Sequence, residues 1–213
     1  MHKWDVSVEE AIAIQQRLRP LVRQTTPFRL KDVRAVAGVD ALYSDVGRAA
    51  VVVLAFPELE VIEEAEATRA SVFPYVPGLL SFREIPAALD ALARLTTRPD
   101  VLICDGQGYA HPRRLGLACH LGVYLSQSTI GCAKSRLIGV YDEPGPNVGD
   151  RSPLVDHGEV IGVALRTKPR TNPLFVSAGH LMDLEMAVAI VLRCLRGYRL
   201  PEPTRLADKL SRS

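Results

Sequence analysis

The chain has 213 residues, of which 47% are hydrophobic and 23% charged, and its formal net charge is +2 at pH 7. This composition excludes a disordered or fibrous protein and supplies enough apolar material for the core of one domain. The weak overall charge permits a polyanionic partner only through local basic patches. We therefore expect a single domain over residues 1–213.

The N-terminal segment and the cysteines both indicate a cytoplasmic protein. The segment MHKWDVSVEE has no apolar signal core, and no apolar run approaches the roughly 20 residues needed to cross a bilayer. The four cysteines stand far apart in apolar contexts and lack the spacing of a zinc site, which indicates reduced, buried thiols. We expect a monomer without a membrane partner.

The first third of the chain predicts one helix and three strands. Residues 7–10 (SVEE) form a capping-box pattern in front of an amphipathic helix at 8–24. Strands are predicted at 33–43, 49–56 and 61–69. Because the turns between them, at 44–47 and 57–58, are short, we expect an antiparallel meander.

The remainder alternates helices and strands. Its predicted elements, in chain order, are a helix at 81–95, a strand at 100–104, a helix at 115–125, a strand at 129–133, a Pro/Gly-rich loop at 141–153, strands at 160–167 and 174–176, a helix at 181–195 and a basic tail at 198–213. Three antiparallel strands followed by helical crossovers is the order of the ribonuclease H-like fold. We therefore expect an α/β protein with a mixed central sheet flanked by helices, in which the first and fourth strands are neighbours.

The stretch VLICDGQGYAHPRR, residues 101–114, points to a catalytic carboxylate. Asp105 ends a buried strand and precedes a glycine loop, which is how an α/β sheet presents an acid at its rim. Asp40 stands near the end of the first strand, so the two carboxylates should lie side by side. Glu84 and His180, each near the start of a predicted helix, could converge on them.

Paired carboxylates indicate a site for a hard divalent cation. Two carboxylates close together repel one another unless a cation shares them, and oxygen ligands favour Mg²⁺ or Mn²⁺. Such an ion lowers the pKa of bound water and neutralises charge during phosphodiester hydrolysis. The sequence therefore favours a metal-dependent phosphodiesterase.

Each candidate also has an ordinary structural explanation. Asp40 could be a solvated carboxylate at a strand end, and Glu84 could interact favourably with its helix dipole. His180 could be an unremarkable histidine near a helix start, although Asp183 on the same face could orient its imidazole. Lys134 could be solvated rather than a phosphate contact, and His111 could pin its loop by hydrogen bonding.

Residues 73–78 (FPYVPG) form a second unusual stretch. Two prolines bracket Tyr75 and Val76, which stiffens the loop and pushes its apolar tip outward. One interpretation is a turn whose tyrosine packs back on the domain. The other is a rigid wedge that enters a base stack and holds an altered base out of the helix.

Six stretches together resemble the bacterial endonuclease V family, the deoxyinosine 3′-endonucleases of DNA repair. They are GVDALY, PYVPGLLSFRE, DGQGYAHPRRLGLACHLG, TIGCAKSRL, NPLFVSAGH and GYRLPEPTRLAD, spread over residues 38–208. The resemblance implies a nuclease that cleaves the second phosphodiester 3′ to deoxyinosine and leaves 3′-hydroxyl and 5′-phosphate ends. It also implies Mg²⁺ as cofactor, with Mn²⁺ able to substitute.

The resemblance implies a role for each catalytic candidate. Asp40 and Asp105 would bind the metal directly, with Glu84 and His180 acting through water. Lys134 would contact the region of the scissile phosphate.

The resemblance also implies two sets of DNA contacts. The strand-separating wedge would be Pro74, Tyr75, Val76 and Pro77. The pocket for the flipped base would be lined by Gly78, Leu80, Gly106 and His111. Separately, the near-neutral net charge suggests that DNA affinity is local, with phosphate contacts from Arg113, Arg114, Lys134, Arg136 and the basic tail.

Two other functions remain open on the sequence. The protein could prefer RNA and cleave 3′ to inosine there, because a 2′-hydroxyl contact requires only a local change. It could instead be a non-catalytic module that marks inosine, a hypothesis that the loss of a metal carboxylate would support. The expected partner is deoxyinosine-containing DNA, with inosine-containing RNA as the alternative.

Overall fold

The computed structural model describes residues 2–42, 46–70 and 73–213. The strands are β1 (Ala35–Leu42), β2 (Val46–Ala55), β3 (Val61–Ala70), β4 (Val101–Cys104), β5 (Ser128–Ala133), β6 (Arg151–Asp156), β7 (Glu159–Leu165) and β8 (Leu174–Ala178). The α-helices are α1 (Val8–Leu18), α2 (Leu80–Leu92), α3 (Leu117–Leu125), α4 (Leu184–Arg193) and α5 (Glu202–Ser211). Short 3₁₀ helices occupy Arg19–Leu21 and Leu30–Asp32.

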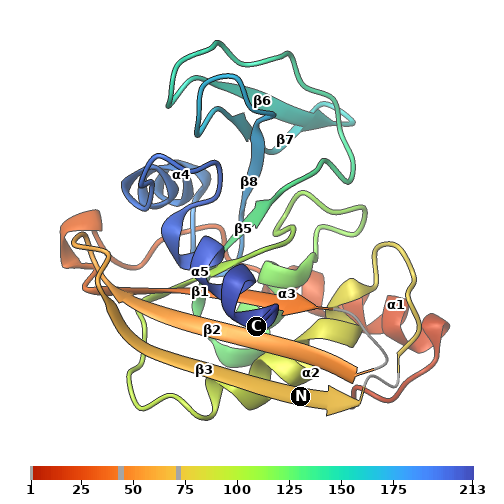
Figure 1. The fold of residues 1–213 in the computed structure, drawn as a ribbon. Coiled ribbons are helices and arrows are strands. Elements are labelled where there is room, and N and C mark those ends of the chain that lie inside the picture. The colour runs from red at the N-terminus through yellow and green to blue at the C-terminus, as the bar shows by residue number, and fades with distance from the viewer. Residues whose placement is uncertain (1, 43–45, 71–72) are drawn as a thin grey trace.

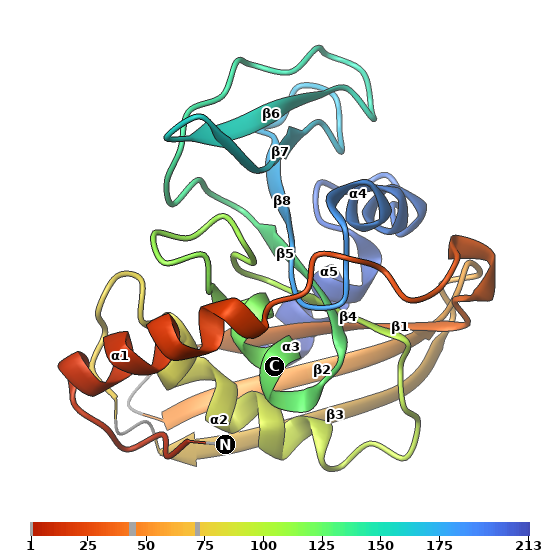
Figure 2. The same ribbon diagram turned by 180° about the vertical axis from the view of Figure 1, so that it is seen from behind.

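The strands form one mixed sheet in the order β3-β2-β1-β4-β5-β8-β7-β6 (Figures 1 and 2). The antiparallel meander of β1, β2 and β3 is confirmed, and β1, β4 and β5 run parallel. The predicted adjacency of the first and fourth strands is also confirmed, since Val39 on β1 pairs with Cys104 on β4. The helical crossovers through α2 and α3 bring these parallel strands together.

The far half of the sheet contains a hairpin that the sequence analysis did not predict. Residues 141–153 were expected to form a loop, but β6 begins at Arg151 and pairs antiparallel with β7. Pro153 within β6 argues against a central strand. It is tolerated because β6 is the edge strand of the sheet, where one side of the backbone needs no partner.

Several boundaries also differ from the predictions. The capping box of Ser7 and Glu10 is confirmed, but α1 ends at Leu18 and gives way to a 3₁₀ helix containing Pro20. The predicted turn at 44–47 falls partly on residues 43–45, outside the described residues, and Val46 already belongs to β2. The helix predicted at 181–195 starts only at Leu184, because Asp183 caps it.

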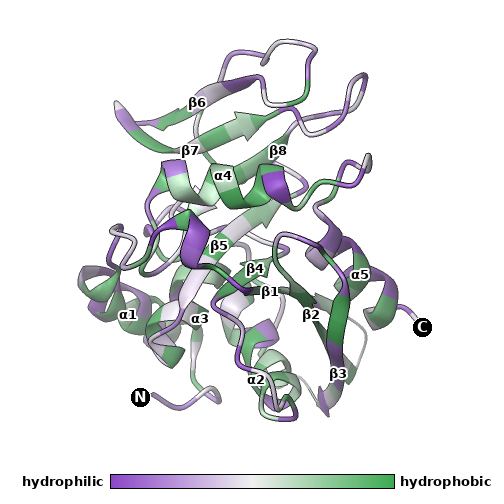
Figure 3. Cartoon of the chain, turned by 90° about the vertical axis from the view of Figure 1, so that its left-hand side faces the viewer, coloured by the Kyte–Doolittle hydropathy of each residue, from purple (hydrophilic) through white to green (hydrophobic). Residues whose placement is uncertain are grey.

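Two apolar layers enclose the sheet. Val101 and Ile103 of β4 face the side covered by α4 and α5, whereas Leu102 and Cys104 face α2 and α3. The central strands are accordingly hydrophobic along their length (Figure 3). This packing leaves the carboxyl ends of β1, β4 and β5 as the edge at which polar groups can gather.

Among the described residues, no helix combines the length and the apolar character needed to span a membrane.

Candidate active site

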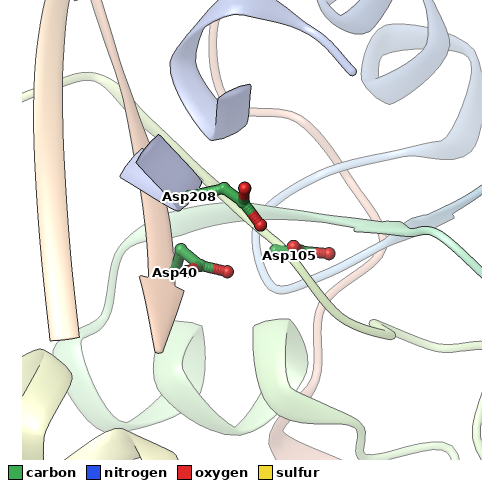
Figure 4. Close-up of side chains that lie close together, drawn as sticks. All are labelled: Asp40, Asp105 and Asp208. Carbon is green, nitrogen blue, oxygen red and sulfur yellow. The ribbon is translucent and has the colours of Figure 1, made fainter. Parts of the chain in front are cut away.

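Three aspartates meet at the carboxyl edge of the parallel strands. One carboxylate oxygen each from Asp40, Asp105 and Asp208 lies within 4.8 Å of the others, and Figure 4 shows the three side chains close together. Asp40 lies on β1 and Asp105 directly follows β4, whose pairing with β1 continues through a 2.9 Å hydrogen bond from the Asp105 N–H to the Val39 carbonyl. The expected proximity of the first two carboxylates is therefore confirmed.

The third carboxylate comes from α5, which packs on β1 and β2. The close approach depends on Gly38, where an added Cβ would stand 2.0 Å from the Pro203 carbonyl oxygen. Near its end the same helix places Ser211, whose hydroxyl donates to Asp40 at 2.6 Å. α5 thus supplies one member of the cluster and orients another.

Lys134, directly after β5, supplies positive charge to the cluster. Its Nζ lies 2.5 Å from Asp105 and 2.6 Å from Asp208. Burial lowers the pKa of Lys134, but hydrogen bonds and charge attraction from both carboxylates outweigh that effect and raise it. Lys134 is therefore an ammonium ion held between two carboxylates.

The pKa of Asp105 reflects its burial first and its charged neighbours second. Burial raises the pKa of Asp105 to about 6, and the charge of Asp40 acts in the same direction. Lys134 opposes the shift. A carboxylate with these neighbours ionises more readily when a cation is near.

This donor set fits a hard divalent cation. The three aspartates offer only oxygen ligands, which suit Mg²⁺, Mn²⁺ and Ca²⁺. The ammonium of Lys134 already shows that positive charge is stabilised there. The residues therefore suit a metal site, and the sequence analysis identified two of its three carboxylates.

Glu84 lies outside this group of three but close to it. It is 6% exposed on α2. Burial is the main reason why the pKa of the Cys104 thiol is raised, and the charge of Glu84 adds to the shift. Because Cys104 adjoins Asp105, Glu84 is a buried acid on the sheet face beside the cluster.

His180 lies away from the carboxylates. It follows β8, which runs antiparallel to β5, and its backbone N–H donates to the Thr129 hydroxyl at 2.9 Å. Its Nδ1 accepts from the backbone of Arg23. Thr129 pairs with Leu102 of β4, and Asp105 lies three residues further along that strand direction, a separation of about 10 Å in extended backbone. The predicted convergence of His180 on the site is thus wrong.

Asp183 likewise does not orient the His180 imidazole. Its carboxylate accepts from the Thr26 hydroxyl at 2.5 Å and from the N–H of Met186 at 2.8 Å, as the N-cap of α4.

A cavity of about 350 Å³ opens beside the cluster. Its lining includes Asp105, Lys134 and Gln107, together with residues predicted for the wedge and the base pocket: Tyr75, Val76, Pro77, Gly78, Leu80, Gly106 and His111. Tyr75 is 67% exposed and does not pack back on the domain. The predicted pocket residues are therefore brought together around one cavity, next to the carboxylates.

The three predicted phosphate contacts have different environments. Arg114 is buried and donates to Asp156 and Glu159, both at 2.8 Å, so it ties the glycine loop to the β6–β7 hairpin. Arg113 is half-buried and donates to the Gly78 carbonyl. Arg136 is exposed beside the cavity and donates to a backbone carbonyl. Of the three, Arg136 is the best placed to meet a phosphate.

Asp208 is the site residue that sequence reasoning missed. It belongs to GYRLPEPTRLAD, one of the stretches that resemble the family, but it lies on a terminal helix with ordinary charge patterning. The only local signal was Gly38 in a strand interior, which can mark a close backbone approach.

Known proteins match the chain over nearly its whole length. The family model Endonuclease V matches residues 16–209. Endonuclease V of Nostoc sp. is 54% identical over 213 residues, covering 99% of this chain and 96% of the relative. The crystal structure of endonuclease V from Streptomyces avermitilis superposes with a TM-score of 0.93 at 46% identity, covering 98% and 93% of the two chains.

Two further likenesses concern ligand and fold. Endonuclease V of Ciona intestinalis, solved with a 24mer DNA containing an inosine followed by a ribo-adenosine, has a TM-score of 0.86 at 32% identity, covering 96% of each chain. Marinitoga piezophila Argonaute, at 12% identity and a TM-score of 0.51 over 84% of this chain, shares the fold alone, which is ribonuclease H-like. The family model and the full-length identity agree with the geometry of the site, and the chain belongs to the endonuclease V family.

Proposed function

We propose that this protein is a metal-dependent endonuclease that recognises deoxyinosine in DNA and hydrolyses the second phosphodiester on its 3′ side, leaving 3′-hydroxyl and 5′-phosphate ends. One observation carries the proposal: the carboxylate cluster borders the same cavity that the wedge residues line. A site of this kind can hold a base and cut the backbone next to it.

The cavity is suited to a single flipped base. Its volume of about 350 Å³ lies at the lower end of the range for small-molecule pockets. Gly106 has no side chain that would keep the edge of a base away from its backbone, and Leu80 supplies apolar wall. Because hypoxanthine and its parent adenine differ in hydrogen-bonding groups on that edge, backbone donors and acceptors can discriminate between them.

The carboxylates would hold Mg²⁺, with Asp40, Asp105 and Asp208 as ligands and Mn²⁺ able to substitute. When bound, such an ion lowers the pKa of a coordinated water and offsets negative charge at the phosphorus. Lys134 would place its ammonium beside the scissile phosphate and stabilise the developing charge. Glu84 would assist from the sheet face, through water.

The wedge would open the duplex. Pro74 and Pro77 restrict the backbone on either side of Tyr75 and Val76, so the exposed aromatic tip can enter a base stack with little loss of entropy. A wedge of this kind fills the gap that a flipped base leaves. Arg136 would add a local phosphate contact.

Cleavage of inosine-containing RNA is the second candidate. It is favoured by the complexes of the Ciona relative, in which the inosine is followed by a ribo-adenosine. Three intact carboxylates argue against the non-catalytic module.

A nicking assay on a labelled duplex with one deoxyinosine tests the proposal. Wild type and Asp105→Ala would be compared with Mg²⁺ and with EDTA, and a matched strand with one inosine in RNA would run in parallel. We expect a nick one nucleotide beyond the lesion that is lost with EDTA and in the variant. An unmodified duplex serves as the control for specificity.

The alternative outcomes are distinct. Cleavage of the RNA alone would assign the protein to RNA metabolism. Binding to both substrates without any cut would refute the enzyme and support a binding module. A cut at unmodified sites would refute the specificity for inosine.

A further inference from the structure

The carbonyl oxygen of Gly78, where the wedge loop ends, accepts hydrogen bonds from three side chains. The donors are Gln15 Nε2 at 3.0 Å, His111 Nε2 at 2.9 Å and Arg113 Nη2 at 2.7 Å. We call these three hydrogen bonds to Gly78 the clamp. We propose that Gln15, on α1, is a positioning residue that acts through the clamp to hold the wedge in its strand-separating position. The inference rests on the proposed function and adds a specificity device to it.

Gln15 is a polar residue in an otherwise apolar contact. It is fully buried, and its helix neighbours Ala11 and Ile14 pack with Phe73 and Leu79, which flank the wedge. A buried carboxamide costs free energy unless its groups are hydrogen-bonded, so an apolar side chain would serve packing alone equally well. The amide at this position indicates a need for directed hydrogen bonds.

Every polar group of Gln15 is engaged. Its Nε2 donates to the carbonyls of Gly78 and, at 3.3 Å, Leu115. Its Oε1 accepts from Nε of Arg113. Gln15 therefore joins α1 to both the wedge loop and the glycine loop that carries Arg113.

His111 is fixed in the form that the clamp requires. Its Nδ1 accepts from the backbone N–H of Arg113 at 3.2 Å, which leaves the proton on Nε2 to donate to Gly78. Burial lowers the pKa of His111 to about 4, so the ring is neutral at physiological pH. The direction of this hydrogen bond therefore does not change in the pH range of the cell.

The clamp acts on the base of the wedge and leaves its tip exposed. Gly78 has φ of +79°, a conformation that side chains rarely adopt, and an added Cβ would stand 3.0 Å from Arg113 Nη2. Phe73 is 3% exposed and anchors the other end of the loop in the core, whereas Tyr75 is 67% exposed. Force on the tip is therefore transmitted to the hydrogen bonds at Gly78.

This arrangement predicts a defect that depends on strand pairing. Opening a duplex requires the wedge to keep its place while a base pair is broken, whereas a base in a single strand is already free to enter the pocket. Loosening the clamp should therefore impair cleavage of duplex deoxyinosine and spare the single strand.

The test compares Gln15→Leu with Gln16→Leu, the same substitution at the exposed neighbouring position on α1. kcat/KM would be measured on deoxyinosine in a duplex and in the same strand alone. For Gln15→Leu we expect the duplex-to-single-strand ratio to fall about tenfold, the effect of losing one or two hydrogen bonds. Gln16→Leu should leave the ratio unchanged.

Base opening is read out separately from cleavage. With 2-aminopurine beside the lesion and EDTA present, wild type should increase fluorescence on binding the duplex, and Gln15→Leu should increase it less. Arg113→Lys retains the charge but loses the fork that reaches Gln15 and Gly78, so it should reproduce the defect. The double variant Gln15→Leu/Arg113→Lys should have a duplex-to-single-strand ratio little lower than that of either single variant, because both substitutions disrupt the same hydrogen bonds.

The outcomes separate the inference from the proposed function. If wild type does not cut deoxyinosine, the proposed function fails. Suppose that wild type cuts and that a thermal transition shows Gln15→Leu to be folded. The positioning role is then refuted if Gln15→Leu loses activity equally on both substrates, or loses it on neither. If Gln15→Leu does not fold, the same ratio measured on Arg113→Lys decides the question.

Discussion

Gly38 and Pro203 are in backbone contact across β1 and α5, at a distance that leaves no room for a side chain. A Cβ on Gly38 would stand 2.0 Å from the Pro203 carbonyl oxygen and 2.6 Å from the backbone nitrogen of Thr204. The contact fixes the start of the helix that carries Asp208. It therefore couples the sheet to the acidic cluster.

Replacing Gly38 by valine should displace α5 and dissociate Asp208 from the other two carboxylates. We expect a loss of Mn²⁺ binding, measured by titration calorimetry, together with lower thermal stability, since α5 also contributes buried Ala207 to the core. Gly47→Ala on β2 is the control, because its Cβ would meet one backbone oxygen at 3.2 Å. Unchanged metal binding in Gly38→Val would contradict the coupling.

Substitutions of Asp208 and of His180 should have very different effects on the rate of DNA cleavage. Asp208→Asn removes a carboxylate from the cluster and should lower cleavage by about 100-fold or more, since even residues that only support a metal ligand are worth 10- to 100-fold. His180→Asn acts at the other end of β5, so single-turnover cleavage should stay within a few-fold of wild type. Equal losses in the two variants would indicate that His180 reaches the reaction.

Substitution of Arg136 should change DNA affinity, whereas substitution of Arg114 should change the stability of the fold. Arg136→Ala removes an exposed charge near the cavity, so it should weaken binding of any DNA sequence and lower the salt dependence by about one phosphate contact. Arg114→Ala leaves Asp156 and Glu159 without their shared cation and should mainly lower the melting temperature. Binding titrations at several salt concentrations, with thermal melts of each variant, distinguish the two effects.

Stability should decrease on mild acidification because of two buried histidines. Burial lowers the pKa of His111 to about 4 and that of His120 to about 3, from an ordinary value of 6.5. Between the lowered pKa of each folded-state histidine and the ordinary value of 6.5, the unfolded chain binds more protons than the folded one. The free energy of unfolding therefore falls as pH drops below about 6.5. Their contribution is complete above that pH.

Thermal melts from pH 8 to pH 5 measure this effect. In His120→Asn the melting temperature should fall less between pH 6.5 and pH 5 than it does in wild type. In the control His157→Asn, at an exposed position, the fall should equal that of wild type. A melting temperature independent of pH over this range would refute the assignment.

The sequence determined the strands of the first half of the sheet, and most of the residues that line the cavity, because these features follow from local chemistry. Runs such as 50–54 are apolar on both faces and can only be central strands, and a short turn forces an antiparallel neighbour. Asp40 and Asp105 could then be placed together, because the carboxyl ends of parallel neighbours share one edge. The exposed position of Tyr75 was expected from the two prolines that bracket Tyr75 and Val76.

Only the tertiary structure decided which remote residues complete the site. His180 was misplaced because β8 runs antiparallel to β5, which carries the end of β8 to the opposite edge of the sheet, and pairing direction is not encoded in a short apolar run. Asp208 was missed because its position depends on contact between Gly38 and a helix some 165 residues later. Arg114 is buried and its charge is neutralised by Asp156 and Glu159, which lie on the β6–β7 hairpin. Local pattern sets each element, whereas pairing direction and long-range packing set which side chains meet.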